Sequence, residues 1–409
     1  MKKVVYAGTQ AASFLQGSRD LKELAELDVS PERVRRAAER IGDERVAERD
    51  AQAAAYEAMP IPARRIVPAD QPTPAVACVQ MDGGRLQFFD RAEPQRNEDD
   101  TFWREMKVGC LWSMTSNVSA EDPCPRLPAS FVDPERMQRM VREIKGFSGP
   151  DASTEDEAEE KRIDERPGRP EPLARSVVAT RREVEAFGKL LVSEAHQRRF
   201  PGAARKAFVA DGSDANWGVW RRHFSDYAPI LDFIHALTYV YAAAMAGRTS
   251  KEGWQAYRAW AQWVWSGQVD RVIAAIELRQ QELGDPAPET PKTAPSAIVA
   301  TSLGYLRNQR SRMDYPKYRK QGLPMTSTYV ESTVKQINRR MKGTEKFWSR
   351  GVESMLTLVA DHLGDTPHAC SFLAEPPPSP DRFPMPSSSR LKSQTARCAH
   401  CLATPYRLG

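Results

Sequence analysis

The sequence predicts an α/β protein, and three observations support this prediction. Two short apolar runs, Ala75 to Met81 and Lys206 to Ala210, have the length of buried strands, and an Asp-Gly pair follows each of them. Helical periodicity dominates residues 233–283. The chain has 409 residues, of which 41% are hydrophobic and 28% charged, which is typical of a soluble globular protein with one large core or a few smaller ones.

The first 70 residues are predicted to be helical. Residues 20–42 hold two short helical patterns, with Ser30 as an N-cap of the second and Gly42 as its end. This layout fits a helix-turn-helix that would present Arg33 and Arg36 to DNA, and it fits an ordinary helical hairpin equally well. Prolines between residues 60 and 74 indicate a domain boundary near residue 70.

Residues 71–232 are predicted to form the first part of a catalytic domain. Runs at 75–81, 85–89 and 107–114 suggest three antiparallel strands at its start. Residues 149–172 are acidic and lack apolar periodicity, so a mobile surface insertion is expected there. A long helix is predicted over 176–198, before the strand at 206–210.

The remaining chain is predicted to be mainly helical. A short strand at 228–232 leads into an all-helical segment, 233–296, whose local core would contain a group of tryptophans. Residues 297–369 would then complete the catalytic domain. The tail, 370–409, need not fold. It contains Cys398-Ala-His-Cys401, which is half of a zinc-binding pattern, and a chance or metal-free cysteine pair fits it better because the other half is missing.

Charge and cysteine content narrow the class of protein. The net charge is +5, yet residues 305–350 carry 12 Lys or Arg against 3 acids, which is typical of a polyanion-binding segment. Six scattered cysteines favour reduced thiols rather than a disulfide-stapled secreted domain. The N-terminus lacks the apolar core of a signal peptide, and no run approaches the roughly 18–20 apolar residues of a membrane span. A cytoplasmic protein is therefore expected.

Three carboxylates suggest phosphodiester chemistry. Asp82 and Asp211 follow the two apolar runs, where a strand holds an acidic side chain rigidly at its end. Glu331 begins an amphipathic helix that continues into Arg339, Arg340, Lys342 and Lys346, whose cations would contact DNA phosphates. A solvated basic face is the alternative. Carboxylate oxygens suit Mg²⁺ or Mn²⁺, and two such ions about 4 Å apart could clamp a scissile phosphate.

With these residues identified, the chain resembles bacterial insertion-sequence transposases of the DDE type, particularly relatives of the Mutator-like superfamily. The resemblance covers about residues 20–363 and depends on the order of the motifs rather than on any one of them. Family members have a strand ending in Asp-Gly, a second Asp-Gly with a nearby Trp, an Asp-x-x-His, a helical block, and a Glu before a basic helix. The matching residues here are Asp82, Asp211 with Trp217, Asp232 with His235, and Glu331.

The resemblance implies a ribonuclease H-like mixed sheet flanked by helices, interrupted by an all-helical insertion. It implies Mg²⁺-dependent cleavage at the ends of a mobile element and transfer of the freed 3′-hydroxyls to target DNA. It also suggests that Asp232, His235 and Trp217 assist near the active site, that the protein is a homo-oligomer when two ends are synapsed, and that it associates with the nucleoid. Two alternatives remain: an inactive or domesticated DNA-binding remnant, and a ribonuclease H-like nuclease that cuts without joining.

Overall fold

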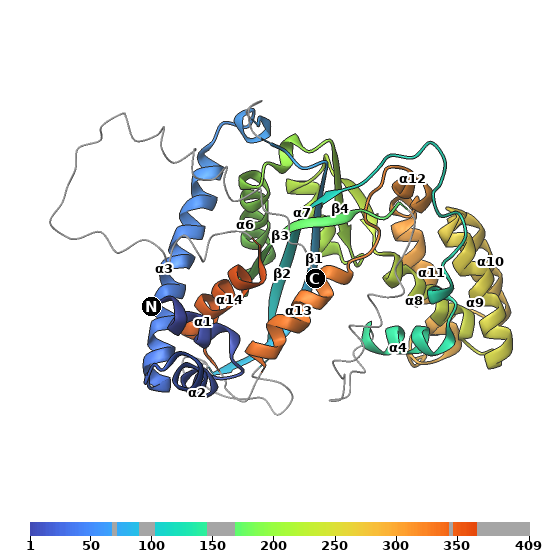
Figure 1. Ribbon diagram of the computed structural model, residues 1–409. Coiled ribbons are helices and arrows are strands. Elements are labelled where there is room, and N and C mark those ends of the chain that lie inside the picture. The colour runs from blue at the N-terminus through green and yellow to red at the C-terminus, as the bar shows by residue number, and fades with distance from the viewer. Residues whose placement is uncertain (68–71, 90–102, 145–167, 343–346, 366–409) are drawn as a thin grey trace, which may run out of the picture. The chain divides into compact units, whose positions relative to one another are not determined.

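A mixed sheet forms the centre of the fold. The computed structural model describes residues 1–67, 72–89, 103–144, 168–342 and 347–365 (Figure 1). The strand order is β3-β2-β1-β4-β5, in which β1, β2 and β3 are antiparallel neighbours while β4 and β5 run parallel to β1. A two-residue strand, β6, pairs with the far end of β1. The bounds are β1 Val76–Phe89, β2 Trp103–Thr115, β3 Glu171–Thr180, β4 Arg205–Ala210, β5 Ala228–Leu231 and β6 Phe347–Trp348.

Two predictions about these strands were wrong. The runs at 75–81 and 85–89 are one strand, because Gly83 and Gly84 pair with Lys107 and Met106 of β2 instead of turning. The predicted helix over 176–198 begins with strand β3, whose Val177, Val178 and Ala179 are buried. The helix itself starts only at Val184. Three antiparallel strands are present, but they are β1, β2 and β3 rather than the three predicted runs, because two of those runs belong to β1 and β3 lies in the segment predicted to be helical.

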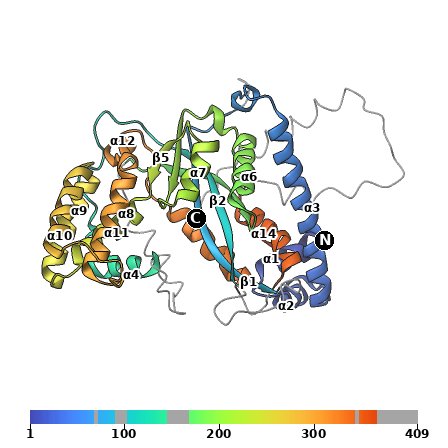
Figure 2. The same cartoon turned by 180° about the vertical axis from the view of Figure 1, so that it is seen from behind.

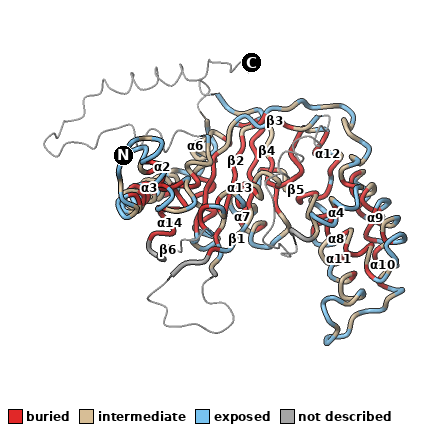
Figure 3. Tube along the Cα trace, turned by 60° about the horizontal axis from the view of Figure 1, so that its bottom comes forward, coloured by how far each residue is buried: buried red, intermediate tan, exposed pale blue. Residues whose placement is uncertain are grey.

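Helices cover both faces of the sheet. Gly109 of β2 faces Leu191 of α6 (Val184–Gln197), whereas the thiol of the next residue, Cys110, contacts Thr333 of α13 (Thr328–Met341). Successive strand residues point to opposite faces, so α6 and α13 lie on opposite sides, as Figures 1 and 2 show. Helix α7 (Asp214–His223) packs beside α6. Buried residues are concentrated along the strands and the inner side of α13 (Figure 3).

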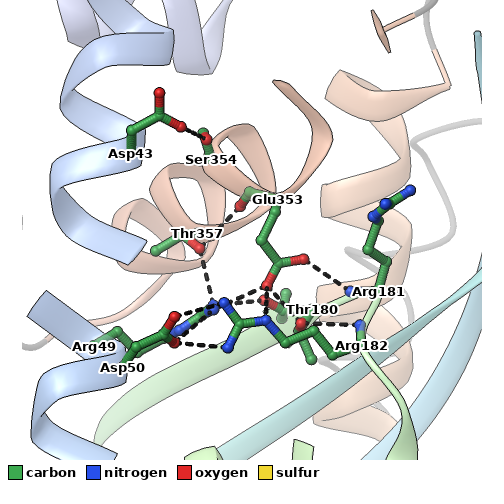
Figure 4. A network of polar contacts seen from close by, with 10 residues as sticks. Asp43, Arg49, Asp50, Thr180, Arg181, Arg182, Glu353, Ser354 and Thr357 are labelled. Carbon is green, nitrogen blue, oxygen red and sulfur yellow. Dashed lines mark hydrogen bonds and ion pairs between the residues drawn. The ribbon is translucent and has the colours of Figure 1, made fainter. Parts of the chain in front are cut away.

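The N-terminal helices pack onto this domain. They are α1 (Lys2–Gln10), α2 (Phe14–Ala25) and α3 (Pro31–Ala58), and α3 contacts α6 and α14 (Ser349–Leu363). Polar contacts tie α3 to α14 and to the end of β3 (Figure 4). Arg49 pairs with Glu353 at 2.9 Å, Glu353 accepts from Thr180 Oγ1, and Arg182 forms a bidentate pair with Asp50.

Gly42 lies inside a helix rather than at its end. The predicted stop is absent because α3 continues to Ala58, and α14 packs closely against α3 at Gly42. A Cβ atom at this position would meet Ser354 Cβ at 2.6 Å and Ser354 O at 2.8 Å. The glycine therefore permits a close helix crossing at the cost of some helix propensity.

A block of helices follows β5. It consists of α8 (Phe233–Met245), α9 (Ser250–Trp265), α10 (Val269–Leu283) and α11 (Pro295–Gln309), followed by the short helices η4 (Arg310–Arg312) and α12 (Tyr315–Lys320). Because α11 packs against α8 and α10, the block extends beyond the predicted limit at residue 296. Trp260 and Trp265 are buried in it, and α4 (Pro134–Ile144) contacts α8. None of the described helices has the length and apolarity needed to cross a bilayer.

Candidate functional site

Three aspartates lie in a row where three parallel strands reach the same edge of the sheet. The last registered pair between β1 and β4 is Gln80 with Val209, so two residues further along each strand come Asp82 and Asp211. The last pair between β4 and β5 is Ala210 with Leu231, and the next residues are Asp211 and Asp232. Neighbouring strands are about 4.8 Å apart, which brings the three side chains into one acidic cluster.

Glu331 reaches this cluster because Gln80 fixes the start of α13 against β1. The fully buried Gln80 side chain donates to Thr326 O at 2.9 Å and accepts from Val330 N at 3.3 Å. Gln80 and Asp82 are alternate residues of β1 and share a face, so the same face holds both the helix and the carboxylate. Gln80 is not among the site residues predicted from the sequence. A lone amide within an apolar run was the available signal.

Asp232 is the most constrained of the acids. Its side chain is fully buried at the N-cap of α8, where Oδ1 accepts from His235 N at 2.7 Å. Oδ2 accepts from Ser327 N, one residue before α13. Both oxygens are therefore occupied by backbone donors, and this carboxylate joins the starts of α8 and α13.

His235 carries a positive charge among these acids. Its Nδ1 lies 3.3 Å from Asp232 Oδ1 and 3.9 Å from Glu331 Oε1. Burial alone would lower the pKa of His235, but contact with Asp232 and the charges of Glu331 and Asp211 raise it to about 9. Burial alone would raise the pKa of Asp232, but its contact with His235 and the charge of that residue hold the pKa of Asp232 below its ordinary value. The ligand atoms of Asp232, His235 and Glu331 all lie within 4.8 Å of one another. With His235 protonated the trio is an ion-pair cluster, and a metal ion would have to displace the proton to bind the imidazole.

Asp82 and Glu331 have raised pKa values. Burial and the negative charges of Asp211 and Asp232 raise the pKa of Asp82 to about 6, against the opposing hydrogen bond from Gly83 N. Burial and the charges of Asp232 and Asp82 raise the pKa of Glu331 to about 7, although His235 opposes them. Close carboxylates that resist ionisation are stabilised by a cation placed between them.

Asp82, Asp211 and Glu331 each have an oxygen available to a divalent ion, although among the described residues their ligand atoms do not form a group within 4.8 Å of one another. Asp82 Oδ1 accepts from Gly83 N, and Asp211 Oδ1 accepts from Ser213 N and the Asn216 amide. Glu331 Oε1 accepts from Ser327 Oγ at 2.9 Å. In the described parts of the chain, no donor contacts the second oxygen of any of the three. Each carboxylate thus has one oxygen that orients it and one free for a ligand, which is the arrangement Mg²⁺ uses with one or two carboxylates and waters.

We expect Mg²⁺ to raise the melting temperature at alkaline but not at acidic pH. The pKa values of Asp82 and Glu331 are raised in the folded state, so without a cation their ionisation lowers stability as pH rises from about 4 to about 7. Millimolar Mg²⁺ should add about 2–6 °C at pH 8 and almost nothing at pH 5, measured by scanning calorimetry. An equal shift at both values, or the same shift in an Asp82→Asn/Glu331→Gln variant, would contradict binding at this cluster.

The remaining predicted residues are scattered. Trp217 is buried against Phe208, and Arg312 lies over its ring. Arg339 and Lys342 are exposed on and after the last turn of α13, and Lys346 lies outside the described residues. Arg33 and Arg36 are exposed on α3, where Arg36 pairs with Glu32 at 2.7 Å. The cysteine pattern at 398–401 also lies outside the described residues, so DNA contacts and zinc both stay predictions.

Arg340 does not fit the predicted contact with DNA. Its side chain is 4% exposed, donates twice to Gly8 O at 2.9 and 3.0 Å, and lies over the Phe14 ring. This guanidinium therefore ties α13 to the N-terminal helices. Arg340 is three residues beyond the buried Ile337, and this position on the apolar face was the sequence signal for burial.

Arg340→Met should lower the free energy of unfolding by about 1.5–3 kcal/mol, because it removes a charged donor from a buried carbonyl. The exposed neighbour Arg339 supplies the matched control, since Arg339→Met should change the free energy of unfolding by about 0.5 kcal/mol or less. Urea denaturation followed by circular dichroism measures both. Equal losses of unfolding free energy in the two variants would show that the buried contact of Arg340 with Gly8 contributes no more to stability than an exposed arginine does.

Comparisons with known proteins do not assign this chain to a family. No family model matches this sequence, and no curated protein matches it at a significant level.

Proposed function

We propose that this chain is a metal-dependent DNA transposase of the DDE type, with a ribonuclease H-like catalytic domain and a helical insertion. The single observation that supports the proposal is that Asp82, Asp211 and Glu331, from two parallel strands and one helix, lie close enough for their charges to interact: Asp211 raises the pKa of Asp82, and Asp82 raises that of Glu331. Three antiparallel strands followed by two parallel ones, with helices between β5 and α13, are consistent with that fold.

Asp82, Asp211 and Glu331 would hold the metal ions through their free oxygens. When bound, divalent cations there supply the Lewis acidity that activates a water or 3′-hydroxyl and neutralises charge on the leaving oxygen. The chain's own contribution is positioning. Gln80 and Asp232 fix the start of α13, and His235 balances part of the negative charge that would otherwise repel a phosphate. Nicking at an element end and strand transfer are the same phosphoryl transfer, with water or DNA as the nucleophile.

The experiment uses labelled duplexes that carry the inverted repeats flanking the coding region. Purified protein should nick them in Mg²⁺ or Mn²⁺, leave 3′-hydroxyls, and join these to a target plasmid, while an unrelated duplex of equal length stays intact. EDTA should stop both steps. Nicking without joined product would favour the nuclease alternative, and binding without nicking would favour an inactive remnant.

A further inference from the structure

An open hollow adjoins the acidic cluster on the side of α7 and α11. Its volume is about 660 Å³, and its wall includes Asp211 and His235 of the cluster. Arg221 of α7, Arg312 of η4 and Tyr239 of α8 also line it. This volume falls within the roughly 300–1,000 Å³ of small-molecule sites, and of the three carboxylates proposed to act on a phosphodiester the hollow reaches Asp211.

Arg312 is held in place from two sides. Its guanidinium lies 4.4 Å from the centre of the Trp217 ring, and Nη1 donates to Gln309 Oε1 at 2.9 Å. Gln309 in turn donates to Gly212 O at 2.9 Å. Gly212 has a φ of +96°, and a Cβ there would meet Tyr305 Oη at 2.8 Å, so this turn requires glycine. The relay links the guanidinium to the residue immediately after Asp211.

The two arginines of this hollow have no ion-pair partner in the described parts of the chain, although Asp211 and Asp214 also line it. Burial and the nearby charge of Arg221 lower the pKa of Arg312. Within the described ranges, neither Arg221 nor Arg312 forms an ion pair, and Asp214 on the same wall pairs with neither. Arg310, two residues away, instead pairs with Asp270 at 2.5 Å. Two guanidiniums that line one hollow without an ion-pair partner are suited to bind an anion, and their planar forks match phosphate oxygens.

We propose that this hollow seats the nucleotide next to the scissile phosphate, with Arg312 and Arg221 binding its backbone phosphate. This inference rests on the proposed function. The Tyr239 ring, stacked on Tyr305 at 3.6 Å with an interplanar angle of 12°, offers a flat wall for the base. The relay through Gln309 and Gly212 would couple the position of that phosphate to the turn that carries Asp211.

The test measures oligonucleotide binding by fluorescence anisotropy in Ca²⁺, using the element-end strand. Arg312→Met and Arg221→Met, which keep apolar bulk, should each weaken binding about tenfold and reduce the salt slope by about 1. Arg310→Met, the matched control, should stay within about twofold. Arg312→Lys should recover part of the loss, and a nucleoside monophosphate should compete with the strand more effectively than the free nucleoside.

The outcomes separate the two proposals. If Arg312→Met binds as well as Arg310→Met while both nick DNA, the nucleotide seat is wrong and the catalytic function stands. If Arg312→Met loses binding while the parent protein never nicks DNA, the seat stands and the catalytic function is wrong. Competition by inorganic phosphate equal to that of the nucleotide would also overturn the seat, because it would show an anion site without a nucleoside component.

Discussion

Asp211→Asn should reduce Mg²⁺-dependent nicking by about 10³-fold or more. Asparagine keeps the size of the side chain and an oxygen that can accept from Ser213 N, so the turn into α7 should persist. The change removes the negative charge and one metal-binding oxygen, a loss of several kcal/mol in the transition state, and each 1.4 kcal/mol is a factor of about ten. Single-turnover nicking of an end duplex measures the effect.

Asp226 provides the matched control for Asp211. It lies between α7 and β5, its side chain is 59% exposed, and it pairs with Lys206 at 2.8 Å. Asp226→Asn therefore removes the same charge on the surface and should leave the nicking rate within about twofold. Equal rates for Asp211→Asn and the parent protein would exclude the proposed active site. An equal loss in both variants would instead point to a general effect of charge on DNA binding.

The acidic residues could be found from the sequence because each follows a local pattern. Asp211 ends an apolar run before a glycine, and Asp232 stands at the boundary between a strand and a helix, where an N-cap is favoured. The course of β1 beyond Asp82 could not be found in this way. Two consecutive glycines read as a turn, and only pairing with β2, about 25 residues further along the chain, extends the strand through them.

Long-range contacts account for the rest of what the sequence did not predict. Gln80 acts through Thr326 and Val330, which are 246 and 250 residues away in the chain, and Arg340 acts through Gly8 at a separation of 332. Local composition assigned Arg340 to a basic surface because its neighbours in sequence are basic. Its partner, Gly8, lies in α1, and no local sequence pattern specifies how α1 packs. Arg340 is therefore buried although its neighbours in sequence are basic.

Asp232→Ala should lower the free energy of unfolding by about 3–5 kcal/mol. It leaves the N–H of Ser327 without its buried acceptor and removes the carboxylate paired with His235, and breaking one partner of a buried ion pair typically costs this much. The pKa of His235 is raised to about 9 from 6.5, so the pair stabilises the fold fully below about pH 6.5 and loses that contribution as pH rises through 9. The loss should therefore be larger at pH 6 than at pH 9.5.

The variant Asp314→Ala is the control that distinguishes loss of a helix cap from loss of the buried connection made by Asp232. It is the exposed N-cap of α12 and accepts from Lys317 N, so Asp314→Ala removes only a cap and should cost about 1 kcal/mol at both pH values. Urea denaturation at the two pH values measures both variants. Because Asp232 also holds Ser327, and Ser327 donates to Glu331, a loss no larger than that of Asp314→Ala would mean that Asp232 does not fix the start of α13. In that case Glu331 would have to be held near Asp82 by Gln80 alone, and Gln80→Leu should then displace it.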